Sequence, residues 1–473
     1  MTHDAVRSDT DNRREPAGTG VREILRISGP IVLGMLSYTV MGFMDRVMIG
    51  WLRSEDALAA VGSADIAAYT LSTLAMGFTS MTTAFVAQCY GQGNRLGCTR
   101  YTWQGIHLSL MAVVLAAMLY PCTAPLFDSM GHSPAVAALE KDYFRIRLYG
   151  YYFVSLIAAL SGFFQGIGRP AVTMYAALLG NAVNLILNYL LIFGKCGFPV
   201  MGIRGAAFAT VTATAVQALF LMAIYLSRSA RTAYGTHRSW KLNLPMCREI
   251  IRVGAPAALA MFLDVANWWI WISYIIGRFG PVQMAANTIA VSFNSITFMP
   301  VIGIHQGIAA IVGQWIGRGN RYLARSRAWT AVRLSVAYMV IMGILIAAFG
   351  GVLTRLLFRP DNAEVVRLAH RLLILAAFFQ AFDAINITLS GALRGAGDTR
   401  WIMWTTALLA YGFGLPLSAG LSIGLGLETF GAWIGATIFI MTLSAAIILR
   451  FHGGRWEKIN LFSETRYNQN PQP

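Results

Sequence analysis

Four aspartates lie inside long apolar stretches of the sequence, where a charged side chain is costly: Asp45, Asp65, Asp264 and Asp383. At the centre of a membrane helix, one Asp costs roughly 2.5–3.5 kcal/mol. An acidic residue kept in such a place usually faces a cavity, where its carboxylate binds a cation or a proton. The four residues therefore indicate a protein that moves something across a bilayer.

The composition of the 473-residue chain agrees with this interpretation, since 56% of its residues are hydrophobic and 12% are charged. Its mean hydropathy of +0.56 is far above that of a soluble protein. Little sequence is left for a separate catalytic domain, so we do not expect the protein to be an enzyme. Apolar windows long enough to cross about 30 Å of hydrocarbon predict an all-α integral membrane protein with twelve transmembrane helices, at 24–51, 57–90, 101–127, 142–164, 170–193, 204–227, 248–278, 282–316, 328–356, 365–393, 401–424 and 429–451.

The net charge of +16 lies mainly in alternate loops, not in one folded basic domain, which argues against nucleic-acid binding. Basic residues gather before the first span, between the sixth and seventh, after the eighth and after the last. Because cytoplasmic loops carry an excess of Lys and Arg, we expect both termini in the cytoplasm and the protein in the inner (plasma) membrane. Residues 1–23 lack the apolar region of a signal peptide and are expected to form a disordered tail, with a second tail at 452–473.

Two motifs occur twice in the chain. QCYGQGNR at 88–95 returns as QWIGRGNR at 314–321, and LSGFFQGIGR at 160–169 returns as LSGALRGAGD at 389–398. Several matches in the same order at nearly one offset indicate an internal duplication. With six spans in each half, both halves enter the membrane from the same side, so a parallel pseudo-two-fold repeat is expected.

The duplication predicts two six-helix lobes, at 24–227 and 248–451, joined by a cytoplasmic linker at 228–247. A cavity between two such lobes can open to either side of the membrane as they rock. The sequence contains neither a nucleotide-binding GxxxxGK[ST] motif nor a channel-like filter motif, so neither direct ATP drive nor filter conduction is supported.

Several stretches resemble the multidrug and toxic compound extrusion (MATE) family, particularly its NorM-like branch. They run in order over nearly the whole chain, from about residue 24 to 451, and include MGFMDRVMIG at 41–50, GNAVNLILNYLLIFG at 180–194, GFPVMGIRGAAFAT at 197–210 and QAFDAINITLSGALRGAGDTR at 380–400. The resemblance implies a two-lobed antiporter that exports organic, usually cationic, compounds in exchange for inward Na⁺ or H⁺. The expected partners are cationic drugs or dyes, the coupling cation and the lipid bilayer; we expect no cofactor and a monomer.

The resemblance also implies roles for individual residues. Acidic residues at the places of Asp264 and Asp383 form the second-lobe cation site of NorM-like proteins, which makes this pair the candidate for binding Na⁺; Asp264 stands where Glu is usual. Two carboxylates in one dry pocket repel each other unless one is protonated or a cation lies between them. Neutralisation could therefore shift the lobe's conformation, although a purely structural, hydrogen-bonded pair is the alternative.

In the first lobe, Asp45 matches the family's acidic residue on the first helix. The resemblance suggests that Asn184 and Asn188, one helical turn apart, face it, with Thr210 as a looser member of the cluster. Their oxygens are suitable ligands for Na⁺ and can also hydrogen-bond a protonated carboxyl. Alternatively, the asparagines hold helices together in lipid.

Arg46 and Asp65 depart from the family pattern, where Thr and a small neutral residue are common. Counted at 1.5 Å per residue from the outer ends of their helices, the two side chains lie at similar depth. We therefore predict a compensating ion pair between them at the outer mouth. Alternatively, Arg46 could partner Asp45 and weaken any proton role for it.

His305 is the histidine placed deep within a predicted span. The simpler interpretation is that His305 is a neutral, hydrogen-bonded histidine in the core. The alternative is that it relays protons or contacts the substrate.

Two other functions stay open. A flippase for lipid-linked oligosaccharides would have the same broad fold but a basic cavity, whereas the candidate cavity residues of this chain are acidic. An integral-membrane enzyme would need clustered His, Asp or nucleophile motifs at the membrane surface, and the sequence has none. Carboxylates serve Na⁺ and H⁺ alike, so the coupling ion is undetermined by sequence.

Overall fold

The structure is a computed structural model that describes residues 18–52, 54–130, 132–358 and 362–462, which form helices and no strand. The first lobe contains α2 (Thr19–Gly50), α3 (Glu55–Ser80), α4 (Thr82–Gly91), α5 (Arg95–Ser109), α6 (Met111–Asp128), α7 (Pro134–Leu148), α8 (Tyr151–Gly166), α9 (Ala171–Phe193) and α10 (Ile203–Tyr225). After α11 (Arg228–Tyr234), the second lobe contains α12 (Leu244–Ile270), η1 (Trp271–Ile275), η2 (Ile276–Phe279), α13 (Pro281–Gly317), α14 (Arg321–Phe358), α15 (Ala363–Ala396), α16 (Thr399–Ala407), η3 (Leu408–Gly414), α17 (Leu415–Ala419), η4 (Gly420–Gly424), α18 (Glu428–His452) and η5 (Arg455–Lys458).

The twelve predicted spans all have helical counterparts. Within the described residues, ten helical segments are long and apolar enough to cross a membrane, three of which join consecutive elements such as α5 and α6; the number is eleven when α7 and α8, bent by 42°, count as one span. The remaining span, predicted at 57–90, corresponds to α3 and α4, which follow each other at Met81. The all-α prediction is confirmed.

The outer surface of the bundle is apolar. On α6 and α14, large hydrophobic side chains point away from the protein and are exposed, although side chains of this kind are usually buried in soluble proteins. A helix satisfies its backbone hydrogen bonds internally, so such a surface can face hydrocarbon. These exposed residues include Val113, Val114, Met118, Ile341, Ile344 and Leu345.

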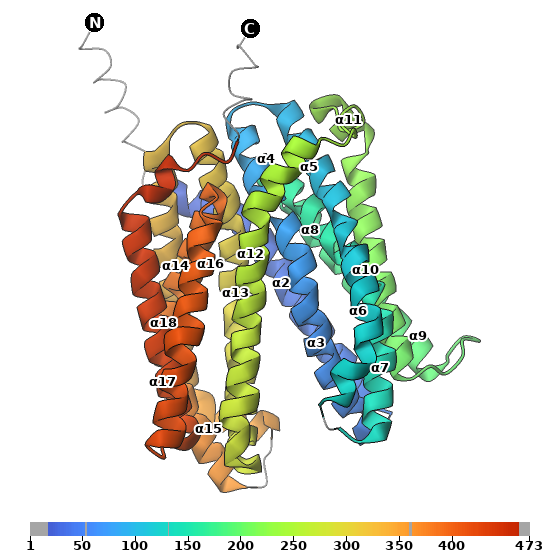
Figure 1. Ribbon diagram of the computed structural model, residues 1–473, viewed down its shortest axis with the longest axis vertical. Helices are drawn as coiled ribbons and strands as arrows, with labels where there is room; N and C mark the ends of the chain where they lie inside the picture. Colours follow the sequence, from blue (N-terminus) through green and yellow to red (C-terminus); the bar gives the residue numbers. More distant parts are fainter. Residues whose placement is uncertain (1–17, 53, 131, 359–361, 463–473) are drawn as a thin grey trace, which may run out of the picture.

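The two lobes converge at one end of the molecule (Figure 1). The described chain begins and ends there, and we call this end the tail face and the opposite end the distal face. In Figure 1 the helices of the second lobe, yellow to red, lie at the left and those of the first lobe at the right, and they diverge toward the distal face.

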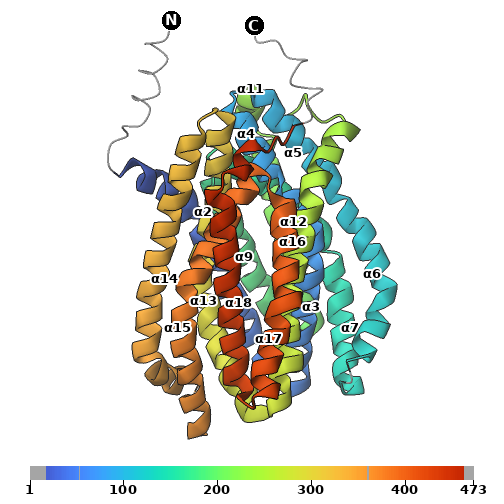
Figure 2. The same ribbon diagram turned by 60° about the vertical axis from the view of Figure 1, so that its left-hand side comes forward.

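Each lobe inserts its first helix into the core of the other at the tail face. Ile24, Ile27 and Ile31 of α2 belong to the hydrophobic core of the second lobe, and Figure 2 shows the start of α2 beside α14. Conversely, Met246 and Ile250 of α12 belong to a core formed largely by α4, α5 and α8 of the first lobe. This reciprocal exchange agrees with the predicted pseudo-two-fold repeat.

The repeated GNR tripeptides are matched turns between helices. Gly93 and Gly319 have φ of +75° and +77°, in the left-handed region that ends helices at low steric cost. The following residues, Asn94 and Asn320, each accept a hydrogen bond from the backbone N–H three residues later, at 2.8 Å and 2.9 Å. One side chain thus caps the start of α5 and the other the start of α14.

The glutamines that open the same motifs bind across the lobe boundary. Gln88 Nε2 donates to the carbonyl oxygen of Gly395 at 3.1 Å, and Gln314 Nε2 donates to that of Gly166 at 2.8 Å. Both acceptors lie in the other repeated motif. The duplicated sequences therefore form two equivalent polar contacts, and both glutamines are buried.

Glycines let the backbones of the two lobes approach at this boundary. A Cβ on Gly91 would lie 2.2 Å from the carbonyl oxygen of Gln314, and one on Gly317 would lie 2.2 Å from that of Gln88. Any side chain at either position would force the lobes apart. The tail face is thus closed by close backbone packing.

The end of the described chain crosses back to the first lobe. Trp456 stacks on Phe451 of α18, whereas Leu461 is fully buried in the first-lobe core and Phe462 lies against the rings of Phe85 and Tyr101. The predicted tail boundaries therefore shift: α2 begins at Thr19, inside the expected first tail, and residues 455–462 of the expected second tail are ordered. The predicted disorder of residues 1–17 lies outside the described residues.

Replacing Gly91 or Gly317 by Ala should lower the thermal stability of the purified protein, because the added methyl group meets a backbone oxygen that cannot move without separating the lobes. Overpacking of this kind costs about 1–3 kcal/mol. The measurement is the unfolding midpoint followed by tryptophan fluorescence in detergent. Gly29→Ala is the matched control, because a Cβ there meets nothing within 4 Å. Equal midpoints for the control and for Gly317→Ala would contradict the close packing.

Candidate functional site

The predicted first-lobe cluster is assembled in the structure. Asn188 Nδ2 on α9 donates to Asp45 Oδ1 on α2 at 2.5 Å, and also lies 3.0 Å from Asn184 Oδ1. Asn184 Nδ2 donates to Thr210 Oγ1 on α10 at 3.3 Å. The chain Asp45–Asn188–Asn184–Thr210 links three helices, since the two asparagines occupy successive turns on one face of α9.

This cluster has an unused acceptor. Asn184 and Asn188 are 1% and 0% exposed, and Asn188 Oδ1 is buried without a hydrogen-bond partner in the described part of the chain. A buried amide oxygen normally has a partner. The open oxygen lies on the residue that contacts Asp45, where it could receive a proton donor or a cation. The role of the cluster in coupling stays a prediction.

The two second-lobe carboxylates differ in their surroundings. Asp383 on α15 is 8% exposed and accepts a hydrogen bond from Asn386 Nδ2 at 3.0 Å. Asp264 on α12 is exposed, and its charge interacts with Asp383 and with Arg394, which lies further along α15. The two charges interact with each other, and the shared cation pocket stays a prediction.

Asp264 faces the space between the lobes. Its charge interacts with Tyr69 of α3 in the first lobe and with Tyr411 of η3 in the second. Tyr411 is held by a hydrogen bond from its hydroxyl to the carbonyl oxygen of Leu263 at 2.8 Å. An exposed carboxylate among groups from both lobes can meet a solute there.

The predicted ion pair between Arg46 and Asp65 is wrong. Asp65 on α3 pairs with Arg147 on α7, at 3.2 Å between Arg147 Nη2 and Asp65 Oδ1, and Tyr143 Oη donates to the same oxygen at 3.4 Å. The prediction compared only how deep the two residues lie along their helices. Which side chains meet also depends on the direction in which each points around its helix axis. Successive residues of a helix differ in that direction by about 100°. Arg46 is exposed on α2.

The alternative pairing of Arg46 with Asp45 is present only as a longer-range electrostatic interaction. Among the described residues, Asp45 forms no ion pair and has Asn188 as its hydrogen-bond partner. Sequence analysis missed Arg147, which lies within the predicted span at 142–164. A charged residue inside an apolar span was the signal that singled out the aspartates, and it applies equally to this arginine.

His305 on α13 has a hydrogen-bond partner. Its Nδ1 lies 2.7 Å from the carbonyl oxygen of Ile387 on α15, so this nitrogen carries the hydrogen. α13 and α15 are closely packed here, since a Cβ on Gly391 would lie 2.4 Å from the His305 carbonyl oxygen. This geometry agrees with the plain interpretation of a satisfied histidine, and a relay role stays a prediction.

Within the described ranges, no group of three or more His, Cys, Asp and Glu side chains converges on one point. A cation at Asp383 or Asp45 would therefore use amide, hydroxyl or backbone oxygens for its other ligands. Hard monovalent and divalent cations favour such oxygen ligands.

Comparison with known proteins gives a consistent result. The family model MatE matches residues 30–190 and 256–419, one stretch in each lobe. The chain is 29% identical over 458 residues to a probable multidrug resistance protein NorM of Brucella suis, covering 95% of this chain and 97% of the relative. It is 30% identical over 432 residues to the multidrug resistance protein NorM of Burkholderia vietnamiensis, covering 90% and 92%.

Solved structures agree in fold. A multidrug resistance MATE family transporter of the MOP superfamily, in an outward-facing conformation, superposes with a TM-score of 0.83 at 22% identity, covering 94% of this chain and all of the other. The eukaryotic MATE transporter AtDTX14 superposes with a TM-score of 0.83 at 19% identity, covering 93% and 97%. At these identities the likeness concerns the fold.

Asp45 and Asn188 should be energetically coupled. Asn188→Ala leaves a carboxylate without its donor, so we expect a loss of about 1–3 kcal/mol in unfolding free energy. Combined with Asp45→Ala, the loss should be smaller than the sum by about 0.5–3 kcal/mol. Unfolding by denaturant in mixed micelles measures each value. Asn188→Ala combined with Asp383→Ala, in the other lobe, is the control and should be additive; additivity in both pairs would contradict the contact.

Proposed function

The chain belongs to the multidrug and toxic compound extrusion family, and we propose that it is a secondary antiporter that exports lipophilic organic cations in exchange for inward Na⁺ or H⁺. Curated relatives that match it over nearly its full length are named as multidrug resistance proteins. A small organic cation is the substrate class that acidic groups between two lobes would attract. The proposal names neither an individual drug nor a single coupling ion.

One observation carries the proposal. In each lobe, a carboxylate within a membrane helix is held by an asparagine amide instead of a basic side chain: Asp45 by Asn188 and Asp383 by Asn386. A neutral donor stabilises the carboxylate without cancelling its charge. Each lobe thus keeps a negative group that a small cation or a proton can neutralise.

We further propose that the tail face lies in the cytoplasm, because the loops there carry the excess of basic residues, and that the protein resides in the inner (plasma) membrane. The closed tail face then corresponds to a state open to the outside. In that state, the coupling cation enters at the carboxylates and the exported compound leaves. Rocking of the lobes would then expose the same groups to the cytoplasm.

The energy available suffices for uphill export. Each elementary charge that moves down a membrane potential of 100 mV releases about 2.3 kcal/mol, before the ion's own concentration gradient is counted. A factor of ten in concentration corresponds to about 1.4 kcal/mol. One inward cation can therefore drive export of a neutral compound with this energy. In one-for-one exchange with a singly charged compound no net charge moves, so the ion's own gradient supplies the energy.

The test is ethidium transport in proteoliposomes under an imposed Na⁺ gradient at equal pH, or an imposed pH gradient without Na⁺. The gradient that drives ethidium uphill identifies the coupling ion. Asp45→Asn, Asp264→Asn and Asp383→Asn should each lower the rate of ion-driven transport by about tenfold or more, equivalent to about 1.4 kcal/mol in the activation barrier.

Asp128→Asn is the matched control, because Asp128 pairs with Lys141 at the distal end of α6 and is mostly exposed. It should transport as the unmodified protein does. Failure of both gradients to drive ethidium would overturn the antiport proposal, as would full transport by a protein in which all three aspartates are replaced.

A further inference from the structure

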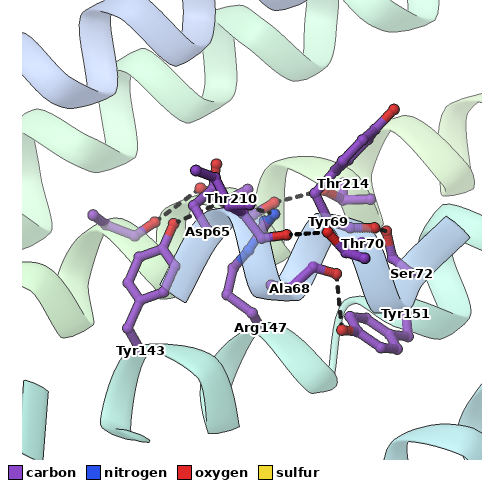
Figure 3. A network of polar contacts seen from close by, with 12 residues as sticks. Asp65, Ala68, Tyr69, Thr70, Ser72, Tyr143, Arg147, Tyr151, Thr210 and Thr214 are labelled. Atoms are coloured by element: carbon purple, nitrogen blue, oxygen red, sulfur yellow. Dashed lines mark hydrogen bonds and ion pairs between the residues drawn. The ribbon is translucent and has the colours of Figure 1, made fainter. Parts of the chain in front are cut away.

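The Asp65–Arg147 pair is fixed by a row of side chains between α3 and the bent span α7–α8 (Figure 3). Tyr143, Arg147 and Tyr151 succeed each other at intervals of four residues, so they lie on one face of that span. Tyr143 Oη and Arg147 Nη2 both contact Asp65, and Tyr151 Oη donates to the carbonyl oxygen of Ala68 at 2.8 Å. Both contacts to the Asp65 carboxylate therefore come from this one face of the span.

The pair is partly shielded from water. The Arg147 side chain is 20% exposed and that of Asp65 is 43% exposed, so neither is fully solvated. Attraction between unit charges is stronger here than at an open surface. Removing one partner would leave the other charge uncompensated in this environment.

The pair is also electrostatically linked to the first-lobe cluster. The charge of Asp45 interacts with both Asp65 and Arg147. Arg46 also interacts with Asp45, but more weakly than Asp65 and Arg147 do. The neighbouring phenols, Tyr143 and Tyr151, are neutral hydrogen-bond donors here.

These charges add up to one uncompensated negative group. Arg147 cancels Asp65, and Asp45 is left with a neutral amide donor. We propose that Arg147 is a built-in counter-ion that limits the first lobe to one monovalent cation per transport cycle. This inference rests on the proposed antiport and deepens it, because it assigns a cation count to one lobe.

The proposal gives opposite effects for the two single substitutions. Arg147→Gln frees the Asp65 carboxylate, so the lobe should take up one further cation. Asp65→Asn frees the guanidinium, which is then the cationic partner available to Asp45, so the lobe should take up one cation fewer. The double variant Asp65→Asn with Arg147→Gln removes both charges and should restore the original count.

The limiting ethidium gradient measures the count directly. With the membrane potential held at zero and a tenfold gradient of the coupling ion, each exchanged cation contributes about tenfold to the ethidium ratio at which net flux stops. Arg147→Gln should raise this limiting ratio by about tenfold and Asp65→Asn should lower it by about tenfold, with the double variant equal to the unmodified protein.

A merely structural pair would change transport rates without moving the limiting ratio, and that outcome overturns the proposal. Arg147→Lys keeps the charge and should keep the ratio even if transport is slower. If Arg147→Gln does not fold, Asp65→Asn decides alone: an unchanged ratio refutes the counter-ion. Absence of ion-driven ethidium movement in the unmodified protein would instead refute the antiport on which the inference rests.

Discussion

A carboxylate inside a membrane helix must find a partner, because the surrounding hydrocarbon supplies none. The four aspartates of this chain meet that requirement in three ways. Asp65 is paired with a guanidinium, Asp45 and Asp383 accept hydrogen bonds from amides, and Asp264 faces the space between the lobes. The carboxylate paired with a guanidinium is neutralised by it. The carboxylates held by amides keep a negative charge that a cation or a proton can neutralise. It is this difference, more than the presence of acidic residues, that gives the bundle its chemistry.

The duplicated motifs serve the contact between the lobes. Each GNR turn ends one helix and caps the next, while the glutamine that opens each motif reaches a carbonyl oxygen of the other lobe. A contact made twice about a pseudo-two-fold axis resists tilting better than a single one. The donors of these two contacts are neutral amides, whereas Glu23 of α2 and Arg327 of α14 form an ion pair across the same boundary.

Much of the architecture was predictable from sequence. Apolar windows and the internal repeat predicted twelve spans and two lobes, and the family resemblance suggested that Asn184 and Asn188 face Asp45, with Thr210 as a looser member of the cluster. The helices were predictable because helix periodicity is a local property of the chain, whereas the contact between Asp45 and Asn188, 143 residues apart, was suggested by the resemblance. The partner of Asp65 was not local, since it depends on how α3 and α7 are rotated about their axes. The exposure of Asp264 likewise depends on how far the lobes stand apart.

The exchange of segments at the tail face bears on how the polypeptide matures during synthesis. Ile24, near the beginning of the chain, packs within the later half, whereas Leu461, near its end, fills a place in the earlier half. When the earlier half has left the ribosome, the place of Leu461 in its core is therefore still empty. It is filled only after the last span has been inserted. Large multi-span proteins usually fold unit by unit, but here neither half can complete its packing alone. Two halves produced as separate polypeptides would have to assemble before either became fully stable.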